Sequence, residues 1–286
     1  MGARIIDGKA IAAGVRKRIA GRVSELKKAG VVPGLAAVLV GDHPASRIYV
    51  AGKQKDAHSV GIASFVHTLP AEVRQEDLLG VIDDLNANSG VHGILVQLPL
   101  PEGLDANVVV AAVAPLKDVD GLHPENAGLL ALGRPRFVPC TPLGVQALLK
   151  QAEVEMEGAH VVIVGRSQLV GRPLSILLSS KGGSANATVT LCHTGTRNLA
   201  EHTARGDVVV VAAGQMGALT GNMIQPGAVV VDVGINRAES GLVGDVDFES
   251  VSRVAAAITP VPGGVGPMTR AMLLENVIKA ATMAAS

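Results

Sequence analysis

Tyr49 and Lys53 are two side chains whose types and spacing would let them act together on one ligand. They are four residues apart in a segment with helical periodicity, and residues at i and i+4 lie on the same face of a helix. A lysine amine acts as a base near neutral pH only when its surroundings lower its pKa from about 10.4. The pair therefore predicts an acid/base site. In the alternative interpretation both residues are only structural: the tyrosine is half-buried, and the lysine packs its aliphatic stem on the surface and keeps its amine in water.

Gln97 is a polar amide near the end of residues 92–98, an apolar run that predicts a buried strand. Open parallel sheets bind ligands at the carboxyl ends of their strands, so this amide is a candidate ligand contact, with a strand cap as the alternative. Asp118 and Asp120 follow in a segment rich in Pro and Gly, where two such carboxylates fit a turn or a metal site. Because no His or Cys stands at ligand spacing, we expect no metal.

Residues 161–173 carry the strongest local signal for a phosphate-binding turn. Gly165 ends an apolar strand and Gly171 opens a predicted helix, whose free N–H groups would attract an anion. The spacing is Gly-x-Ser-x-x-x-Gly rather than Gly-x-Gly-x-x-Gly, so the motif alone is weak. Four more predicted strands after it strengthen the prediction of a dinucleotide site.

The second strand of this set indicates which dinucleotide binds. An NAD site usually has Asp or Glu near the end of that strand to hold the ribose 2′-hydroxyl. Here the strand runs into His193 and Thr194, without a carboxylate, and Arg166 lies in the first turn. These residues favour NADP, unless Arg166 is only a solvated turn residue. Short-chain dehydrogenases also carry Tyr-x-x-x-Lys, but their pair follows the glycine turn, whereas this pair precedes it.

The elements that must position these residues alternate between strand and helix. A helix over residues 8–30 is followed by strands at 35–40, 63–69 and 92–98, with helices at 44–60 and 72–88 between them. This order predicts a parallel sheet with right-handed crossovers.

A second set of elements follows the loop-rich residues 99–142. A helix over 143–151 leads to strands at 159–164, 188–192, 207–212, 228–233 and 256–259, and a last helix covers 269–283. We therefore expect an α/β protein of two domains, with a boundary near residue 140, a Rossmann-like second domain and a C-terminal helix that returns to the first.

Composition narrows the class of partner. The chain has 286 residues, 48% of them hydrophobic and only 17% charged, which predicts a large buried core. Twenty-five basic residues balance 25 acidic ones, so the sequence lacks the basic footprint of a nucleic-acid-binding protein. Cys140 and Cys192 follow no metal or disulfide pattern and read as small buried residues in a reducing compartment. The start lacks a secretory h-region and no apolar run spans a bilayer, which predicts a cytoplasmic protein with no membrane partner.

Taken together, these segments resemble the bifunctional methylenetetrahydrofolate dehydrogenase/methenyltetrahydrofolate cyclohydrolase family, from residue 5 to about 280. The resemblance is carried by residues 46–50 with Lys53 and Lys55, and by residues 93–101, 117–121, 139–142, 165–167, 170–173, 232–237 and 259–269. It implies oxidation of 5,10-methylenetetrahydrofolate by NADP⁺ and hydrolysis of the methenyl product to 10-formyltetrahydrofolate. It also implies a catalytic folate-binding domain, 1–140 plus about 268–286, an NADP-binding domain, 141–267, and a homodimer.

The resemblance also implies roles for single residues. Lys53 matches the lysine that assists water attack and proton transfer, Gln97 the amide that positions it, and Asp120 the carboxylate that grips the pterin. Tyr49 matches the aromatic side chain that packs on the folate. Further substrate contacts are implied at Leu98, Pro99, Pro262, Gly263 and Gly264, and cofactor contacts at Gly165, Arg166, Ser167, Gly171, His193, Thr194 and Ile235.

The chain departs from the family pattern at three places. Asp56, Ala57 and His58 stand where the family often has Ala-Cys-Glu, Thr194 replaces a serine, and residues 181–186 look like a short insertion. A monofunctional dehydrogenase of the same family remains the first alternative, and a non-catalytic NADP-binding regulator the second.

Overall fold

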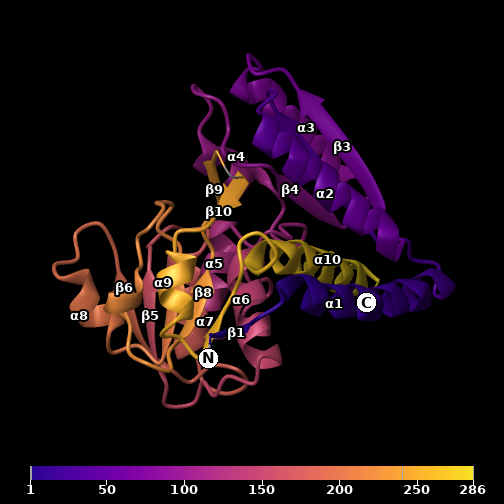
Figure 1. Ribbon diagram of the computed structural model, residues 1–286. Coiled ribbons are helices and arrows are strands. Elements are labelled where there is room, and N and C mark those ends of the chain that lie inside the picture. Colours follow the sequence, from indigo (N-terminus) through magenta and orange to yellow (C-terminus); the bar gives the residue numbers. More distant parts are fainter. Residues whose placement is uncertain (1, 240, 286) are drawn as a thin grey trace. The chain divides into compact units, whose positions relative to one another are not determined.

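The computed structural model describes residues 2–239 and 241–285, and the chain divides into two compact units. The three-stranded unit contains Gly14–Cys140 and the residues from Arg270 onward. The six-stranded unit contains the residues up to Ala13 together with Thr141–Thr269. Each unit is an α/β structure built on a parallel sheet (Figure 1).

The three-stranded unit has its sheet in the order β3-β2-β4, with both pairs of neighbours parallel. Its strands are β2 (Gly34–Val40), β3 (Ala63–Leu69) and β4 (Gly93–Val96). Its helices are α1 (Gly8–Lys28, from Gly14 onward), α2 (Pro44–Val60), α3 (Gln75–Ala87), α4 (Ala106–Ala112), α5 (Pro124–Ala131) and α10 (Val265–Ala284, from Arg270 onward).

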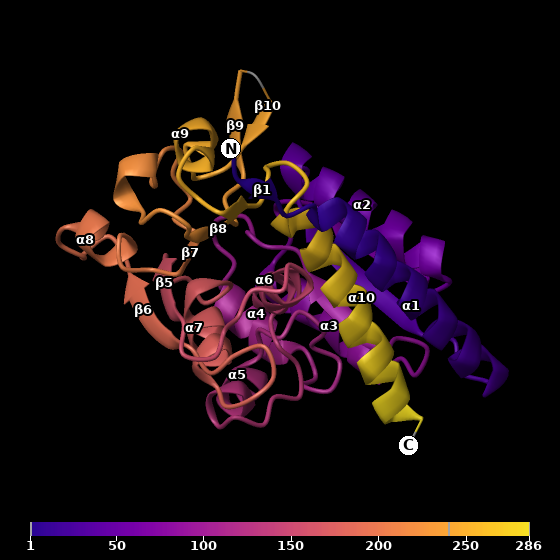
Figure 2. The same cartoon turned by 60° about the horizontal axis from the view of Figure 1, so that its bottom comes forward.

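The central strand β2 is buried along its whole length. Ala36, Val38 and Val40 lie on one face, where they share a core with α3 and α4. Full burial of the intervening residues requires that helices cover the other face as well, as is usual for parallel sheets. Figures 1 and 2 both show α1 and α10 side by side, and an ion pair joins Arg22 of α1 to Glu275 of α10.

The six-stranded unit has the strand order β1-β11-β8-β7-β5-β6, and every adjacent pair is parallel. The strands are β1 (Arg4–Ile5), β5 (His160–Val164), β6 (Thr188–Cys192), β7 (Val208–Val211), β8 (Val229–Asp232) and β11 (Ala257–Ile258). The helices are α6 (Cys140–Gln151, from Thr141 onward), α7 (Gly171–Ser179), α8 (Leu199–Thr203), the short 3₁₀ helix η1 (Gly221–Met223) and α9 (Phe248–Ser252). An antiparallel hairpin, β9 (Asn236–Ala238) with β10 (Gly241–Val243), follows β8.

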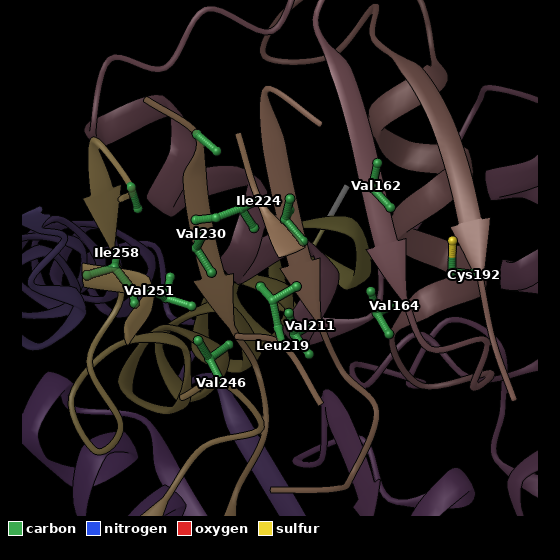
Figure 3. Close-up of a cluster of buried hydrophobic side chains, with 13 residues drawn as sticks. Val162, Val164, Cys192, Val211, Leu219, Ile224, Val230, Val246, Val251 and Ile258 are labelled. Atoms are coloured by element: carbon green, nitrogen blue, oxygen red, sulfur yellow. The ribbon is translucent and has the colours of Figure 1, made fainter. Parts of the chain in front are cut away.

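The core on one side of this sheet consists of small β-branched and aliphatic side chains (Figure 3). Val162, Val211 and Val230 project from neighbouring strands, and Leu219 and Val251 pack against them from the connecting segments. This composition agrees with the scarcity of aromatic residues in the chain, which are 1% of the total.

The expected α/β class, the two parallel sheets and all eight expected strands are confirmed. One difference concerns the N-terminus, which was expected in the first domain. Arg4 and Ile5 form β1, which pairs with β11, so the first thirteen residues group with the six-stranded unit. Four further elements were not predicted: the helices α4 and α5 lie in the segment expected to be loop, and the strands β9 and β10 form a hairpin.

Two kinds of feature are absent from the residues that the structure describes. No helix in residues 2–239 and 241–285 is long and apolar enough to cross a membrane. Within the same ranges, no three His, Cys, Asp or Glu side chains are arranged to hold a metal ion.

Candidate active site

The amine of Lys53 lies at the end of β4, where it meets Gln97. Lys53 projects from α2, and its Nζ donates a hydrogen bond of 3.0 Å to Oε1 of Gln97. The amide is fixed in turn, because its Nε2 donates to the carbonyl oxygen of Leu98 at 2.7 Å. A cis peptide bond joins Leu98 to Pro99. The Gln97 side chain, itself held by the backbone that follows β4, therefore orients the Lys53 amine.

Burial dominates the electrostatics of this lysine. Removal from water lowers the pKa of Lys53, while the nearby Asp120 and Cys140 act in the opposite direction. The same burial raises the pKa of the Asp120 carboxyl, against the opposing effects of Lys53 and a hydrogen bond from Cys140. Burial also raises the pKa of the Cys140 thiol well above its usual range. The site therefore favours a neutral amine close to a carboxyl group.

Asp120 is held in place by a network of buried polar groups on both sides of it. Asp118 is buried and accepts hydrogen bonds from the backbone of Leu122 and His123. Asn276 of α10, also buried, donates to the carbonyl oxygens of Val119 at 2.8 Å and of Val138 at 3.1 Å. These bonds fix the backbone on each side of the carboxylate.

Tyr49 lies one helical turn before Lys53 and is half-buried. Burial raises the pKa of its phenol, and the cation of Arg270 partly offsets this effect. Arg270, on α10, is paired with Asp56 of α2 at 3.0 Å between Nε and Oδ2. The structure thus brings Tyr49, Lys53, Gln97 and Asp120 into one neighbourhood of the three-stranded unit.

In the six-stranded unit, the turn between β5 and α7 is too tight for side chains at its two glycines. Gly165 has a φ of +125°, and a Cβ there would lie 2.1 Å from the carbonyl oxygen of Ala212. A Cβ on Gly171 would lie 1.8 Å from the carbonyl oxygen of Gly165. Glycine is therefore required at both positions, and the second of them begins α7, the helix whose N-terminus follows the turn.

The polar residues of this unit gather at the carboxyl ends of neighbouring strands. Arg166 and Ser167 follow β5 and are exposed, and the Ser167 hydroxyl accepts a hydrogen bond from the N–H of Val170. His193 and Thr194 follow β6, which is the neighbour of β5, and no carboxylate stands there. The described geometry therefore leaves the Arg166 side chain free to face an anion.

Two buried carboxylates hold the segments around Ile235, which follows β8. Asp232 accepts hydrogen bonds from the N–H groups of Gly234, Asp245 and Val246. Asp245 accepts from the N–H of Gly214, beyond β7, and from the side chain of Asn236. Ile235 itself is 45% exposed, so the network presents an apolar side chain to solvent beside the strand ends.

This network should make stability depend on pH. Burial raises the pKa of Asp232 from 3.8 to about 6, despite its three N–H donors. Between about pH 4 and 6 the unfolded chain loses this proton and the folded chain keeps it, so the free energy of unfolding falls as pH rises, by about 3 kcal/mol at most. Urea unfolding at a series of pH values checks this. Asp232→Asn should remove that part of the slope, and an identical slope in the variant would refute the assignment.

Three further substrate contacts were expected in the loop that precedes α10. These residues, Pro262, Gly263 and Gly264, lie in the six-stranded unit. The carbonyl oxygen of Gly263 accepts a hydrogen bond from the N–H of Lys9 at 2.9 Å. This turn is therefore tied to the beginning of α1.

Comparison with known proteins identifies the family. A family model described as tetrahydrofolate dehydrogenase/cyclohydrolase, catalytic domain, matches residues 6–120, and its NAD(P)-binding counterpart matches residues 139–285. The chain belongs to the tetrahydrofolate dehydrogenase/cyclohydrolase family. It is 53% identical over 285 residues to the bifunctional protein FolD of Nitrosospira multiformis, covering 99% of this chain and 98% of that protein.

Solved structures of the tetrahydrofolate dehydrogenase/cyclohydrolase family agree with this fold. The bifunctional enzyme FolD of Campylobacter jejuni is 48% identical, with a TM-score of 0.95 over 98% of this chain and 99% of that one. A Trypanosoma brucei enzyme, crystallised with NADP and an inhibitor, is 39% identical, with a TM-score of 0.94 over 99% and 98% of the two chains. Like its relatives, the protein is an enzyme with dehydrogenase and cyclohydrolase activity.

Sequence reasoning missed three residues near Lys53. Cys140 was expected only as a small buried residue; it is buried, and it also contacts Asp120. Asn276 is a polar residue on α10 whose neighbours at positions 272, 273 and 280, one turn away, are apolar, a signal that was available in the sequence. Arg270 carries no local signal, since only the fold brings it to α2.

Proposed function

We propose that the protein oxidises 5,10-methylenetetrahydrofolate with NADP⁺ and then hydrolyses the 5,10-methenyl product to 10-formyltetrahydrofolate, using Lys53 as the central group. The observation that carries this assignment is the partly buried Lys53 amine, oriented by Gln97 and held near Asp120. A lowered pKa increases the share of neutral amine, which is the form that acts as a base.

In the hydrolysis, water adds to the methenyl carbon, the bond from that carbon to N5 breaks, and one proton is released. The Lys53 amine takes the proton from the attacking water, and the resulting ammonium can return it to N5. Gln97 keeps the amine pointed at the reacting carbon through its 3.0 Å hydrogen bond. The positive charge of the methenyl substrate opposes protonation of Lys53 and so keeps it ready to act.

Asp120 and Tyr49 bind and orient the folate. The Asp120 carboxyl accepts hydrogen bonds from the amino groups of the pterin, and its backbone is fixed by Asp118 and Asn276. Tyr49 packs its ring on the substrate one turn away from Lys53. Leu98, Pro99, Pro262, Gly263 and Gly264 complete the proposed substrate contacts.

The turn after β5 fits a dinucleotide, because it joins a buried parallel strand to the N-terminus of α7 and has no room for a Cβ at either glycine. Gly165, Ser167 and Gly171 would hold the pyrophosphate, and Arg166, His193 and Thr194 the 2′-phosphate, with Ile235 beside the ring system. When bound, NADP⁺ accepts the hydride of the first reaction. The relative from Trypanosoma brucei, which was crystallised with NADP, supports this choice.

One experiment tests the function directly. The purified protein is given 5,10-methylenetetrahydrofolate with NADP⁺ or with NAD⁺, and methenyl absorbance and 10-formyl product are followed. We expect both products, with NADP⁺ preferred. A protein that accumulates methenyl product without hydrolysing it is a monofunctional dehydrogenase, and one that forms neither product is not this enzyme.

We also propose a cytoplasmic homodimer that uses residues 141–264. Leu242 on β10 and Phe248 on α9 are 44% and 41% exposed, so this range presents apolar side chains that a second copy could cover. A two-fold interface would be self-complementary. Sedimentation at micromolar concentration should show a dimer; a stable and fully active monomer would contradict the proposal.

A further inference from the structure

The guanidinium group of Arg270 lies beside α2 and uses little of its hydrogen-bonding capacity. Its Nε is 3.0 Å from Oδ2 of Asp56, yet neither of these buried atoms makes a hydrogen bond of acceptable geometry. In the part of the chain that the structure describes, its two terminal nitrogens donate to no acceptor. Arginine has five N–H donors in a planar fork, so most of this fork is available to a ligand.

Gly52 accounts for the position of this cation. A Cβ at Gly52 would lie 2.5 Å from Nη1 of Arg270, so the guanidinium occupies the space of a missing side chain on α2. Gly52 stands between Tyr49 and Asp56 and directly before Lys53. The cation therefore lies on the proposed catalytic helix, with its side chain 32% exposed.

Tyr49 and Lys53, on the same face of α2, have different charged neighbours. Lys53 has Asp120 and Cys140 as its electrostatic neighbours, whereas Tyr49 has Arg270. If Asp120 takes the pterin and Lys53 faces the one-carbon bridge, the remainder of the folate continues toward Tyr49 and Arg270. The group at that end of a folate is glutamate, which carries carboxylates.

We propose that Arg270 is a substrate-specificity residue that binds a carboxylate of the glutamate tail, with the Tyr49 hydroxyl as a second donor. This inference rests on the proposed function. A guanidinium binds carboxylate through parallel N–H donors. Asp56 balances the charge of the partly buried cation when no substrate is bound and holds the guanidinium against α2. Because the pair uses the Nε side, the terminal nitrogens remain free for the substrate.

The test removes the charge from the protein and from the ligand in turn. Two substrates are compared: 5,10-methylenetetrahydrofolate with one glutamate, and its tetrahydropteroyl methylamide analogue, which keeps the pterin and aminobenzoyl groups but has no carboxylate. The measured quantity is kcat/KM for the glutamate substrate divided by kcat/KM for the methylamide analogue. We expect Arg270→Gln to reduce this ratio by about 5- to 30-fold. An equal loss for both substrates would mean that Arg270 only ties α10 to α2, and the proposal would be overturned.

A second variant guards against misfolding. Gly52→Ala places a methyl group where Nη1 lies, moving the guanidinium without removing it, and alanine is favourable inside a helix. It should lower the same ratio by at least about threefold. Arg74→Gln is the matched control, since Arg74 is an exposed arginine paired with Asp77 in the same unit; an equal fall of the ratio in this control would overturn the proposal.

Two further readouts separate the possible failures. The KM for NADP⁺ should not change in Arg270→Gln, and a rise there with an unchanged substrate ratio would assign the anion to a cofactor phosphate and overturn the inference. If the wild-type enzyme turns over neither folate, the proposed function itself is wrong. Activity on both folates with no effect of Arg270 on their ratio leaves the function intact and removes only this inference.

Discussion

Replacing Lys53 with Met should reduce methenyltetrahydrofolate hydrolysis by at least ~10²-fold, the usual contribution of a positioned acid or base. Methionine keeps the stem length and much of the packing but removes the amine that Gln97 orients. Hydride transfer depends mainly on holding the reactants in position, so the dehydrogenase step should lose less. The measurement is the rate of hydrolysis of methenyltetrahydrofolate, with NADP affinity determined on the same preparation.

Lys55→Met is the matched control for this substitution. Lys55 lies on the same helix and is exposed, so its loss should leave both activities near the wild-type level. Near-normal hydrolysis in Lys53→Met would overturn the role of Lys53. Loss of NADP binding would instead indicate damage to the fold.

The pH profile provides a second check of the same residue. Because burial lowers the pKa of Lys53, the neutral amine should form below the usual range of lysine. Hydrolysis in the wild type should therefore rise with pH as the ammonium loses its proton, and level off when the amine is neutral. In Lys53→Met the remaining activity should lack this rise.

Replacing Arg166 with Ala should weaken NADP binding much more than NAD binding. Loss of one charge-assisted contact costs about 1.5 to 3 kcal/mol, which corresponds to about a 10- to 150-fold fall in the preference for NADP. Arg166 is exposed after β5, and no carboxylate at the end of β6 is available to hold an unphosphorylated ribose. The measurement is kcat/KM for each cofactor.

Arg253→Ala serves as its control, because Arg253 is an exposed arginine in the same unit whose partner is Glu249. It should leave the cofactor preference unchanged. A preference that stays at the wild-type value in Arg166→Ala would mean that another group recognises the 2′-phosphate.

Much of the fold followed from local pattern. Short apolar runs bounded by Gly predicted the strands of both sheets, and four-residue spacing placed Tyr49 and Lys53 on one helix. The pairing of β1 with β11 was not visible, because two residues carry no periodicity and their partner lies more than 250 residues away in the sequence. The helices α4 and α5 were missed because frequent Pro and Gly concealed short helical turns.

The candidate site, like the fold, was predicted only in part from the sequence. Residue type and position identified Lys53, Gln97 and the glycine turn as candidates. The contact of Cys140 with Asp120, and the packing of Arg270 against Gly52, depend on segments that are distant in the sequence. Spacing arguments act within one element, so they could not find contacts that tertiary packing creates.

The path of the chain through the two units has a consequence for protein synthesis. The strand β1 is translated near the start, but its neighbour β11 ends at residue 258, and the part of α10 in the three-stranded unit begins only at Arg270. Neither unit can therefore be completed on the ribosome until almost the whole polypeptide has emerged. Nascent chains should remain open, and dependent on protection from aggregation, for nearly all of translation. For the same reason, a gene cut at residue 140 would produce two fragments that each lack part of their own unit.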